Sequence, residues 1–208
     1  MVYQVAEKFK SVQGEGVHVG CPMAFIRLIG CSVGKKVCSA CDTDFDSQLV
    51  WRGGGSYIAD DLCDWAYPYG TLCLTGGEPL NQPLEEILTS AAARSLRVHI
   101  ESSGTVKLAD DLDRIHWLCI SPKPGFLPEM IELADEIKVI VPGLGVGDGW
   151  PTLDDALRWA EGGKPVFLQP RNAKHDVDKV NLTYVLDLLH EYPQLRLSVQ
   201  LHKLLHVQ

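Results

Sequence analysis

Residues Met23 to Cys41 read MAFIRLIGCSVGKKVCSAC, and this stretch indicates the fold class of the whole chain. Its apolar run up to Gly30, interrupted by Arg27, predicts a buried strand. Three cysteines follow the strand, and the last two form a C-x-x-C pair, a spacing that lets one loop hold a metal centre with two thiolates. Because α/β proteins place their chemistry where strands end, the stretch predicts an α/β fold with a metal centre at one strand end.

Further apolar runs of strand length alternate with helical patterns along the chain. We expect strands over 2–10, 22–29, 71–75, 96–101, 118–120, 136–141, 165–169 and 195–201, and helices over 58–67, 84–94, 153–160 and 177–192. Residues 53–55 (three glycines) suggest a flexible break, and helices are expected to be short or missing over 104–135. Such alternation predicts parallel strands, and right-handed crossovers curl a parallel sheet. The 208 residues are too few for the roughly 250 of a full eightfold barrel, so we expect a smaller, incomplete one.

The composition excludes several classes of protein. With a net charge of −8, the chain lacks the basic face that general nucleic-acid binding needs. No apolar run approaches the roughly 18 residues of a membrane span, and the N-terminus has no signal-peptide core. The seven cysteines are odd in number and three are bunched, unlike a secreted disulfide framework. We therefore expect a cytoplasmic protein with no membrane or nucleic-acid partner.

Polar or Gly/Pro residues follow nearly every predicted strand. Side chains at the C-terminal ends of parallel strands converge on one mouth, so these segments predict a single site. They are Cys31, Thr75-Gly76-Gly77-Glu78, Glu101-Ser102-Ser103, Ser121-Pro122-Lys123 and Gln169-Pro170.

The cysteine cluster allows two interpretations. A structural zinc site needs four ligands, so His18 or Cys21 would have to supply the fourth. An iron–sulfur cluster held by three protein thiolates leaves one iron open, and S-adenosylmethionine occupies that place in radical chemistry. A structural zinc site is closed, whereas these cysteines lie at the functional end of the sheet, which favours the second interpretation.

The motifs together match one known family. In chain order they are Gln13-Gly14-Glu15-Gly16, Phe25-Ile26-Arg27-Leu28 before Gly30-Cys31, Cys41-Asp42-Thr43, Thr75-Gly76-Gly77-Glu78-Pro79, Glu101-Ser102-Ser103-Gly104, Ser121-Pro122-Lys123, Glu136-Ile137-Lys138, Gln169-Pro170 and residues 197–203. Over almost its whole length the chain resembles the 7-carboxy-7-deazaguanine synthases, a family of the radical S-adenosylmethionine superfamily. The resemblance implies a modified, incomplete (β/α)6-type partial barrel with a reduced helical layer, which forms one radical S-adenosylmethionine core domain over residues 1–208.

The sequence departs from the family pattern in three places. The cysteine spacing is C-x6-C-x2-C, whereas the superfamily usually has C-x3-C-x2-C. Ala40 stands where an aromatic residue often packs near the adenine, so another residue must do so here. The chain ends in Gln208, where several members end in proline.

The resemblance implies three cofactors. Cys31, Cys38 and Cys41 would hold a 4Fe–4S cluster, and Thr43 would bind Mg²⁺, which the acidic loop around it suits. S-adenosylmethionine would lie against residues of the strand ends and the cysteine loop. These are Ala40, Gly76, Gly77, Glu78, Glu101, Ser102, Ser121, Pro122, Lys123 and Gln169.

The implied substrate is 6-carboxy-5,6,7,8-tetrahydropterin. Its binding residues would be Val12, Gln13, Gly14, Glu15, Arg27, Thr75, His202 and Gln208. Arg27, a charge inside an apolar strand, would clamp the carboxylate and count with the three cysteines as catalytic. Other interpretations are open: Arg27 could form a salt bridge with Glu15 or an aspartate, and Glu101 and Lys123 could form an ion pair at the strand ends. His202 could be an exposed histidine of the tail.

The implied activity is that of a carbon–nitrogen lyase in queuosine and 7-deazapurine biosynthesis. A radical from S-adenosylmethionine abstracts a hydrogen from C6 of the pterin, the ring contracts, and ammonia leaves. The resemblance also implies that the hydrogen is returned, that the chain forms a homodimer, and that flavodoxin or ferredoxin supplies the electron. The rival functions are a glycyl-radical activating enzyme and a non-enzymatic, zinc-stabilised binding module.

Overall fold

In the residues that the computed structural model describes, nine strands form one open sheet, in the order β3-β1-β2-β4-β5-β6-β7-β8-β9. From β2 onward all neighbours are parallel, whereas β1 runs antiparallel to both β2 and β3. The structure describes residues 1–34, 36–38, 41, 48–109, 112–142, 144, 147–171 and 178–206, without the side chain of residue 112.

The elements are short and evenly spread along the chain. The strands are β1 (Tyr3–Val12), β2 (Pro22–Leu28), β3 (Gly55–Tyr57), β4 (Thr71–Gly76), β5 (Arg97–Ser102), β6 (Trp117–Ile120), β7 (Glu136–Val141), β8 (Val166–Pro170) and β9 (Arg196–Leu197). The helices are α1 (Ala59–Ala66), α2 (Glu85–Ala93), α3 (Pro128–Leu133), α4 (Leu153–Glu161), α5 (Lys179–Glu191) and α6 (Leu201–Leu205). None of the described helices combines the length and the apolar character needed to cross a membrane.

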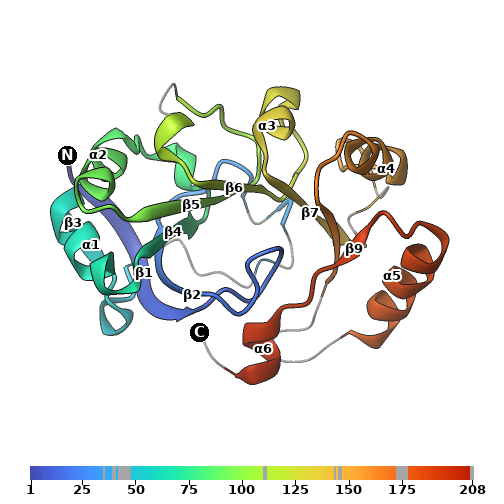
Figure 1. The fold of residues 1–208 in the computed structure, drawn as a ribbon, viewed down its shortest axis with the longest axis horizontal. Helices are drawn as coiled ribbons and strands as arrows, with labels where there is room; N and C mark the ends of the chain where they lie inside the picture. The colour runs from blue at the N-terminus through green and yellow to red at the C-terminus, as the bar shows by residue number, and fades with distance from the viewer. Residues whose placement is uncertain are drawn as a thin grey trace.

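The sheet is curved, and its two sides carry different residues. Figure 1 shows α1 to α5 around the outside of the curve, whereas the loop after β1 and the short α6 lie on its inner side. Strand alternation separates the two sets of side chains. In β4, Leu72 and Leu74 join the large core under the helices. Cys73 points the other way and packs with Met23 and Phe25 in a small inner cluster.

Most predicted elements are confirmed within one or two residues, and the curved, incomplete α/β barrel is confirmed as well. The antiparallel pairing of β1 was not predicted. It arises because residues 13–21 connect β1 to β2 without a crossover helix. Hydrogen bonds from Gln13 N to Cys21 O and from Gly20 N to Gln13 O, both 2.8 Å, close this loop.

The predicted final strand over 195–201 is wrong beyond Leu197. Ser198 N still donates to Leu168 O at 3.0 Å, but the chain then turns inward. Leu201 N donates to Gly14 O at 2.9 Å, which begins α6 against the loop after β1. The polar residues Ser198 and Gln200 explain the turn, because both bond to polar side chains on the inner side of the sheet.

One short helix forms where helices were expected to be short or missing, and one further expectation fails. Residues 128–133 form α3, which begins at a proline in the first helical turn and buries Met130 and Ile131. The three glycines are no flexible break, because Gly55 belongs to β3 and pairs with Val5. A Cβ on Gly54 would lie 2.3 Å from Ala6 O, so that glycine permits close packing of two backbone segments.

Candidate active site

The cysteine loop follows β2 directly. Cys38 N donates to Gly34 O at 3.1 Å and Cys41 N donates to Cys38 O at 2.8 Å, so turns place the C-x-x-C pair. Burial raises the pKa of the Cys38 thiol; the Lys123 ammonium opposes this, and the thiols of Cys41 and Cys31 add to it. The Lys123 ammonium and the other two thiols of the loop therefore all act on the Cys38 thiol electrostatically.

Neither candidate for a fourth zinc ligand lies beside these cysteines. Cys21 comes directly before β2 and Cys31 follows it, and a strand of seven residues is about 20 Å long. His18 packs against His99 and Trp117, with ring centroids 4.6 Å and 4.5 Å away, near the opposite ends of β5 and β6. In the part of the chain that the structure describes, no three His, Cys, Asp or Glu side chains could hold a single metal ion. The two residues named as a fourth zinc ligand thus lie away from the cysteine loop, and the cluster that the three cysteines would hold stays a prediction.

Three strand-end segments that were predicted to bind S-adenosylmethionine are hydrogen-bonded to one another. Ser121 N donates to Ser102 O at 2.8 Å, and Lys123 N donates to Ser103 O at 3.2 Å. The Lys123 ammonium also donates to the carbonyl and hydroxyl oxygens of Ser121, both at 2.7 Å. Burial lowers the pKa of Lys123 to about 8. We refer to the ends of β4, β5 and β6 together with the cysteine loop as the rim.

Glu78 links the first two of these segments. Its fully buried carboxylate accepts hydrogen bonds from Leu80 N at 3.2 Å, from the Ser102 hydroxyl at 2.9 Å and from Ser103 N at 2.8 Å. The Ser103 hydroxyl donates a fourth bond. Glu78 is therefore an anchor of the rim, and its predicted contact with the amino group of S-adenosylmethionine stays a prediction.

The two glycines before Glu78 bring the rim against the start of the cysteine loop. Gly77 N donates to Leu28 O at 3.2 Å, and Glu78 N donates to Gly30 O at 2.8 Å. A Cβ on Gly77 would lie only 2.0 Å from Gly30 O, and Gly76 has a φ of +144°. The two glycines thus permit a close approach between two backbone segments, the end of β4 and the start of the cysteine loop.

At the rim, residues predicted to bind the substrate and residues predicted to bind the cofactor meet in one part-buried network, which we call the inner network. Gln13 Nε2 donates to Glu101 Oε1 at 3.0 Å, and Thr75 Oγ1 donates to Glu101 Oε2 at 3.1 Å. Gln13 comes from the loop after β1, Thr75 from the end of β4, and Glu101 from the end of β5. The loop after β1 therefore reaches across the inner side of the sheet to the rim.

Glu15 lies deeper in the same network. Its carboxylate accepts from Gln200 Nε2 at 2.9 Å and from Gln169 Nε2 at 3.3 Å, and it contacts the Lys138 ammonium. Burial by itself would raise the pKa of Glu15, but Lys138, Gln200 and His202 outweigh this effect and lower it to about 2. Glu15 is therefore ionised at neutral pH.

Arg27 is held by Glu7, a residue that was not predicted to belong to the site. Arg27 Nε donates to Glu7 Oε1 at 2.9 Å, and Arg52 donates to Glu7 Oε2 at 3.1 Å. A register shift in β1 between Val5 and Glu7 brings Glu7 opposite Arg27. Arg27 also pairs with Thr75 in the parallel register, so it lies on the strand next to the network of Glu101. Among the described residues, Arg27 forms an ion pair with Glu7.

His202 is not an exposed tail residue, because it lies on α6 against the loop after β1. A Cβ on Gly14 would lie 2.2 Å from His202 Nδ1 and 3.0 Å from its backbone nitrogen. Gly14 is therefore needed for α6 to pack at this point.

The remaining predicted residues divide into two groups. Val12 ends β1, and Pro122 is buried in the segment after β6. Ala40, Thr43 and Gln208 lie outside the described residues, so their predicted contacts stay predictions.

Sequence reasoning missed Lys138, Glu7 and Gln200. Lys138 carried a signal, since it is a charge inside the apolar strand EIKVIV, as Arg27 is in FIRLI. Glu7 and Gln200 carried no such signal. Glu7 enters through the register shift in β1, and Gln200 through the unpredicted turn after β9.

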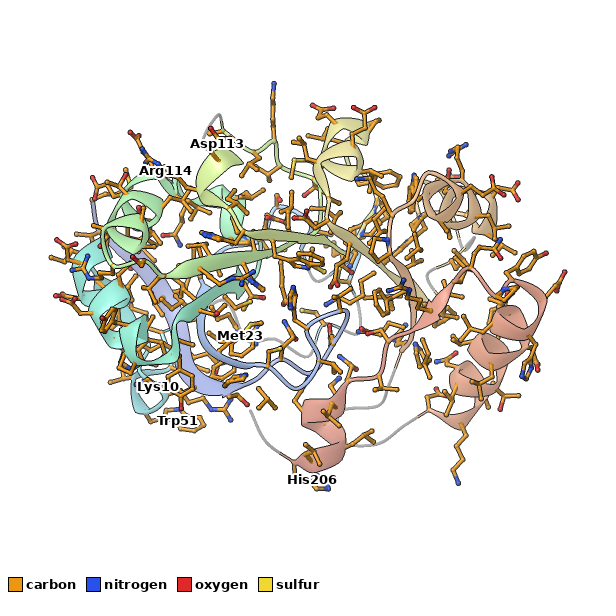
Figure 2. All side chains as sticks on the ribbon, viewed as in Figure 1. Lys10, Met23, Trp51, Asp113, Arg114 and His206 are labelled. Carbon is orange, nitrogen blue, oxygen red and sulfur yellow. The ribbon has the colours of Figure 1, made fainter. Side chains whose placement is uncertain are left out.

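An open hollow of about 500 Å³ lies at the surface, apart from the residues described so far. It is lined by Lys8, Phe9, Lys10, Trp51, Arg52 and Trp65, and Figure 2 shows Lys10 and Trp51 together at one corner of the molecule. The ammonium groups of Lys8 and Lys10 lie 5.0 Å and 5.3 Å from the Trp65 ring centroid. These cations are thus already engaged with aromatic faces, and the hollow is not part of the inner network.

Comparison with known proteins identifies the family. A 7-carboxy-7-deazaguanine synthase from Bordetella pertussis is 35% identical, with 98% of each chain covered. A protein of the same name from Bradyrhizobium diazoefficiens is 31% identical over the full length of both chains. The crystal structure of QueE from Escherichia coli superposes with a TM-score of 0.72 at 25% identity, covering 97% of this chain and 95% of that one. No protein-family model matches the chain. The chain belongs to the 7-carboxy-7-deazaguanine synthase family.

Proposed function

We propose that the chain is a radical S-adenosylmethionine lyase that converts 6-carboxy-5,6,7,8-tetrahydropterin to 7-carboxy-7-deazaguanine and ammonia. One observation carries this proposal beyond family membership. The Gln13–Glu101 hydrogen bond joins the loop proposed to bind the pterin to the rim proposed to bind the cofactor. Such a junction is what the reaction requires, because the hydrogen that is abstracted must lie beside the adenosyl group.

At the rim, the thiolates of Cys31, Cys38 and Cys41 would hold the cluster. When bound, the cluster and S-adenosylmethionine supply a 5′-deoxyadenosyl radical. The buried Lys123 ammonium, which acts electrostatically on the Cys38 thiol, would offset part of the negative charge of the thiolates. Glu78 keeps the Gly76–Gly77 turn and the Ser102–Ser103 segment in fixed relative positions, so the cofactor meets a preformed surface.

Below the rim, the pterin would lie between the loop after β1 and the ends of β2 and β4. The Glu15 carboxylate accepts hydrogen bonds from N–H donors of the ring, and the Gln13 amide can both donate and accept. The Arg27 guanidinium, oriented by Glu7, would bind the carboxylate of the substrate. Thr75 and His202 would complete the pocket, and the packing of α6 on Gly14 would exclude water from below.

Several parts of the proposal rest on the resemblance and on general chemistry. Thr43 would bind Mg²⁺, Ala40 would lie near the adenine, and Gln208 would lie near the pterin. A single core domain, a homodimer and a flavodoxin or ferredoxin donor complete the proposal. We also propose a cytoplasmic location, where reducing conditions keep cluster-binding thiols available.

The test is anaerobic reconstitution of the chain with iron and sulfide, followed by incubation with S-adenosylmethionine, a reductant and the carboxypterin. We expect a brown protein with four irons per chain and a product with the mass of 7-carboxy-7-deazaguanine. A Cys38→Ala variant, as the matched control, should form neither. A protein that cleaves S-adenosylmethionine but leaves the pterin unchanged would reject the proposed substrate and favour an activating enzyme. A colourless protein with one zinc would reject radical chemistry.

A further inference from the structure

Lys138 is a buried cation for which the proposed function has not yet assigned a role. It lies in the middle of β7 and its side chain is 6% exposed. Its ammonium contacts the Glu15 carboxylate and lies 3.8 Å from Glu101 Oε1. An ammonium group is costly to bury without charged partners, so these two contacts explain why Lys138 is tolerated here.

The two partners belong to different halves of the site. Glu15 is the acidic residue of the proposed pterin pocket, and Glu101 belongs to the proposed cofactor surface. Glu101 is also held by neutral donors from Gln13 and Thr75. Among the described residues, the Glu15 carboxylate also accepts hydrogen bonds from the side-chain amides of Gln200 and Gln169. Glu15 depends more strongly than Glu101 on Lys138, because the ammonium hydrogen-bonds to Glu15 but lies 3.8 Å from Glu101, and the Glu15 side chain is less exposed (13% against 25%).

We infer that Lys138 is a positioning residue for pterin recognition, which holds the Glu15 carboxylate as an acceptor for the N–H edge of the ring. This inference rests on the proposed function. A carboxylate has about four acceptor positions, and a neutral carboxyl group gives up part of this capacity to its own proton. Lys138, Gln200 and Gln169 occupy three positions, which leaves about one for a ring N–H.

Removing the ammonium would change the protonation of Glu15. Burial raises the pKa of a carboxyl group, and Lys138 is the strongest of the groups that lower it for Glu15. The Lys138 ammonium keeps its proton, because Cys119, Glu101 and Glu15 raise its pKa far above the usual value against the effect of burial. The titratable groups around the pair are Cys73, Glu101, Cys119, Lys123, Glu136 and His202.

The test uses the full chain with reconstituted cluster and measures the KM for the carboxypterin between pH 6 and pH 9. The variants are Lys138→Met, which removes the charge at similar length, and Lys138→Arg, which restores it. Lys179→Met, at an exposed lysine, is the matched control. Reductive cleavage of S-adenosylmethionine without pterin is measured in parallel.

We expect Lys138→Met to raise the KM about 10- to 100-fold at pH 7, the effect of losing a hydrogen bond to a charged group. The KM should then fall as the pH rises, because Glu15 loses its proton at higher pH in this variant, whereas the wild-type KM should not change through Glu15. Lys138→Arg should recover most of the affinity, and Lys179→Met should match the wild type. Cleavage of S-adenosylmethionine should fall less than pterin affinity.

A second comparison does not depend on the folding of the single variant. If Lys138 acts through Glu15, adding Lys138→Met to Glu15→Gln should leave the KM of Glu15→Gln unchanged. A further rise in KM in the double variant would overturn the inference, and so would a wild-type KM profile in Lys138→Met. Both comparisons require that the wild-type chain forms 7-carboxy-7-deazaguanine from the carboxypterin. Absence of that product rejects the proposed function instead.

Discussion

Glu78→Gln exchanges one carboxylate oxygen for an NH2 group inside the rim. Glu78 Oε1 accepts from Leu80 N and the Ser102 hydroxyl, and Oε2 accepts from Ser103 N and its hydroxyl. In either amide orientation, the new NH2 group faces one serine hydroxyl, which can rotate to accept, and one backbone N–H, which cannot. The variant therefore loses a backbone hydrogen bond, and the bonds that remain go to a neutral acceptor. We expect the free energy of unfolding to fall by about 2–4 kcal/mol.

Urea denaturation of the cluster-free chain measures this change directly, with Glu132→Gln as the matched control. Glu132 is exposed on α3, so its substitution should change the free energy of unfolding by less than about 0.5 kcal/mol. If Glu78→Gln unfolds like the wild type while S-adenosylmethionine binding is lost, the reasoning is refuted, because Glu78 would then serve the ligand and not the rim.

Three further predictions concern the pocket below the rim. Arg27→Ala should reduce turnover of the carboxypterin at least about tenfold, because a charge-assisted hydrogen bond to the substrate is lost. Reductive cleavage of S-adenosylmethionine should be spared. Equal loss of both activities would mean that Arg27 is structural. Gly14→Ala should displace α6, because the new Cβ would lie 2.2 Å from His202 Nδ1, and this should raise the KM for the pterin. Gly162→Ala is the control, since its Cβ would lie 3.3 Å from the nearest atom, and it should leave the KM unchanged. The pKa of Glu15 is lowered from 4.5 to about 2, so its contribution to stability is present above pH 4.5 and is lost as the pH falls towards 2. About 3 kcal/mol of stability should disappear over that range in urea titrations of the cluster-free chain. Glu15→Gln should flatten this dependence, and an unchanged slope in the variant would contradict it.

The inner network was only partly predictable from the sequence. Strand ends such as Thr75, Glu101 and Gln169 were expected to converge, because side chains at the ends of parallel strands meet at one edge. The structure brings Thr75 and Glu101 into contact, as this rule predicts. The same rule cannot reveal that residues 13–21 fold across the inner side of the sheet, since a loop without regular structure carries no periodicity.

Partners of buried charges were harder to predict than the charges themselves. Arg27 was recognised as a charge that needs a partner, but Glu7 comes opposite it only through a register shift in β1. Lys138 breaks an apolar strand in the same way, and its partner Glu15 lies 123 residues away in the sequence. Pairing over such distances is decided by the tertiary fold, and local sequence patterns do not encode it.

The last strand shows the competition between local propensity and side-chain chemistry. Leu195 to Leu201 alternates as a strand would, yet pairing ends at Leu197. Gln200 finds the Glu15 carboxylate at 2.9 Å, and a longer β9 would carry it away from that partner. A buried charge–dipole contact thus outweighs continued pairing at an exposed sheet edge.

The central claim is that the rim and the pocket below it form one site, in which C6 of the pterin meets the adenosyl group. The most direct measurement uses carboxypterin that carries deuterium at C6, in a single turnover with the reconstituted chain. The account predicts deuterium in the adenosyl group of the recovered S-adenosylmethionine or 5′-deoxyadenosine, together with 7-carboxy-7-deazaguanine. Deuterium that stays entirely on unconverted pterin, while S-adenosylmethionine is cleaved, would contradict it.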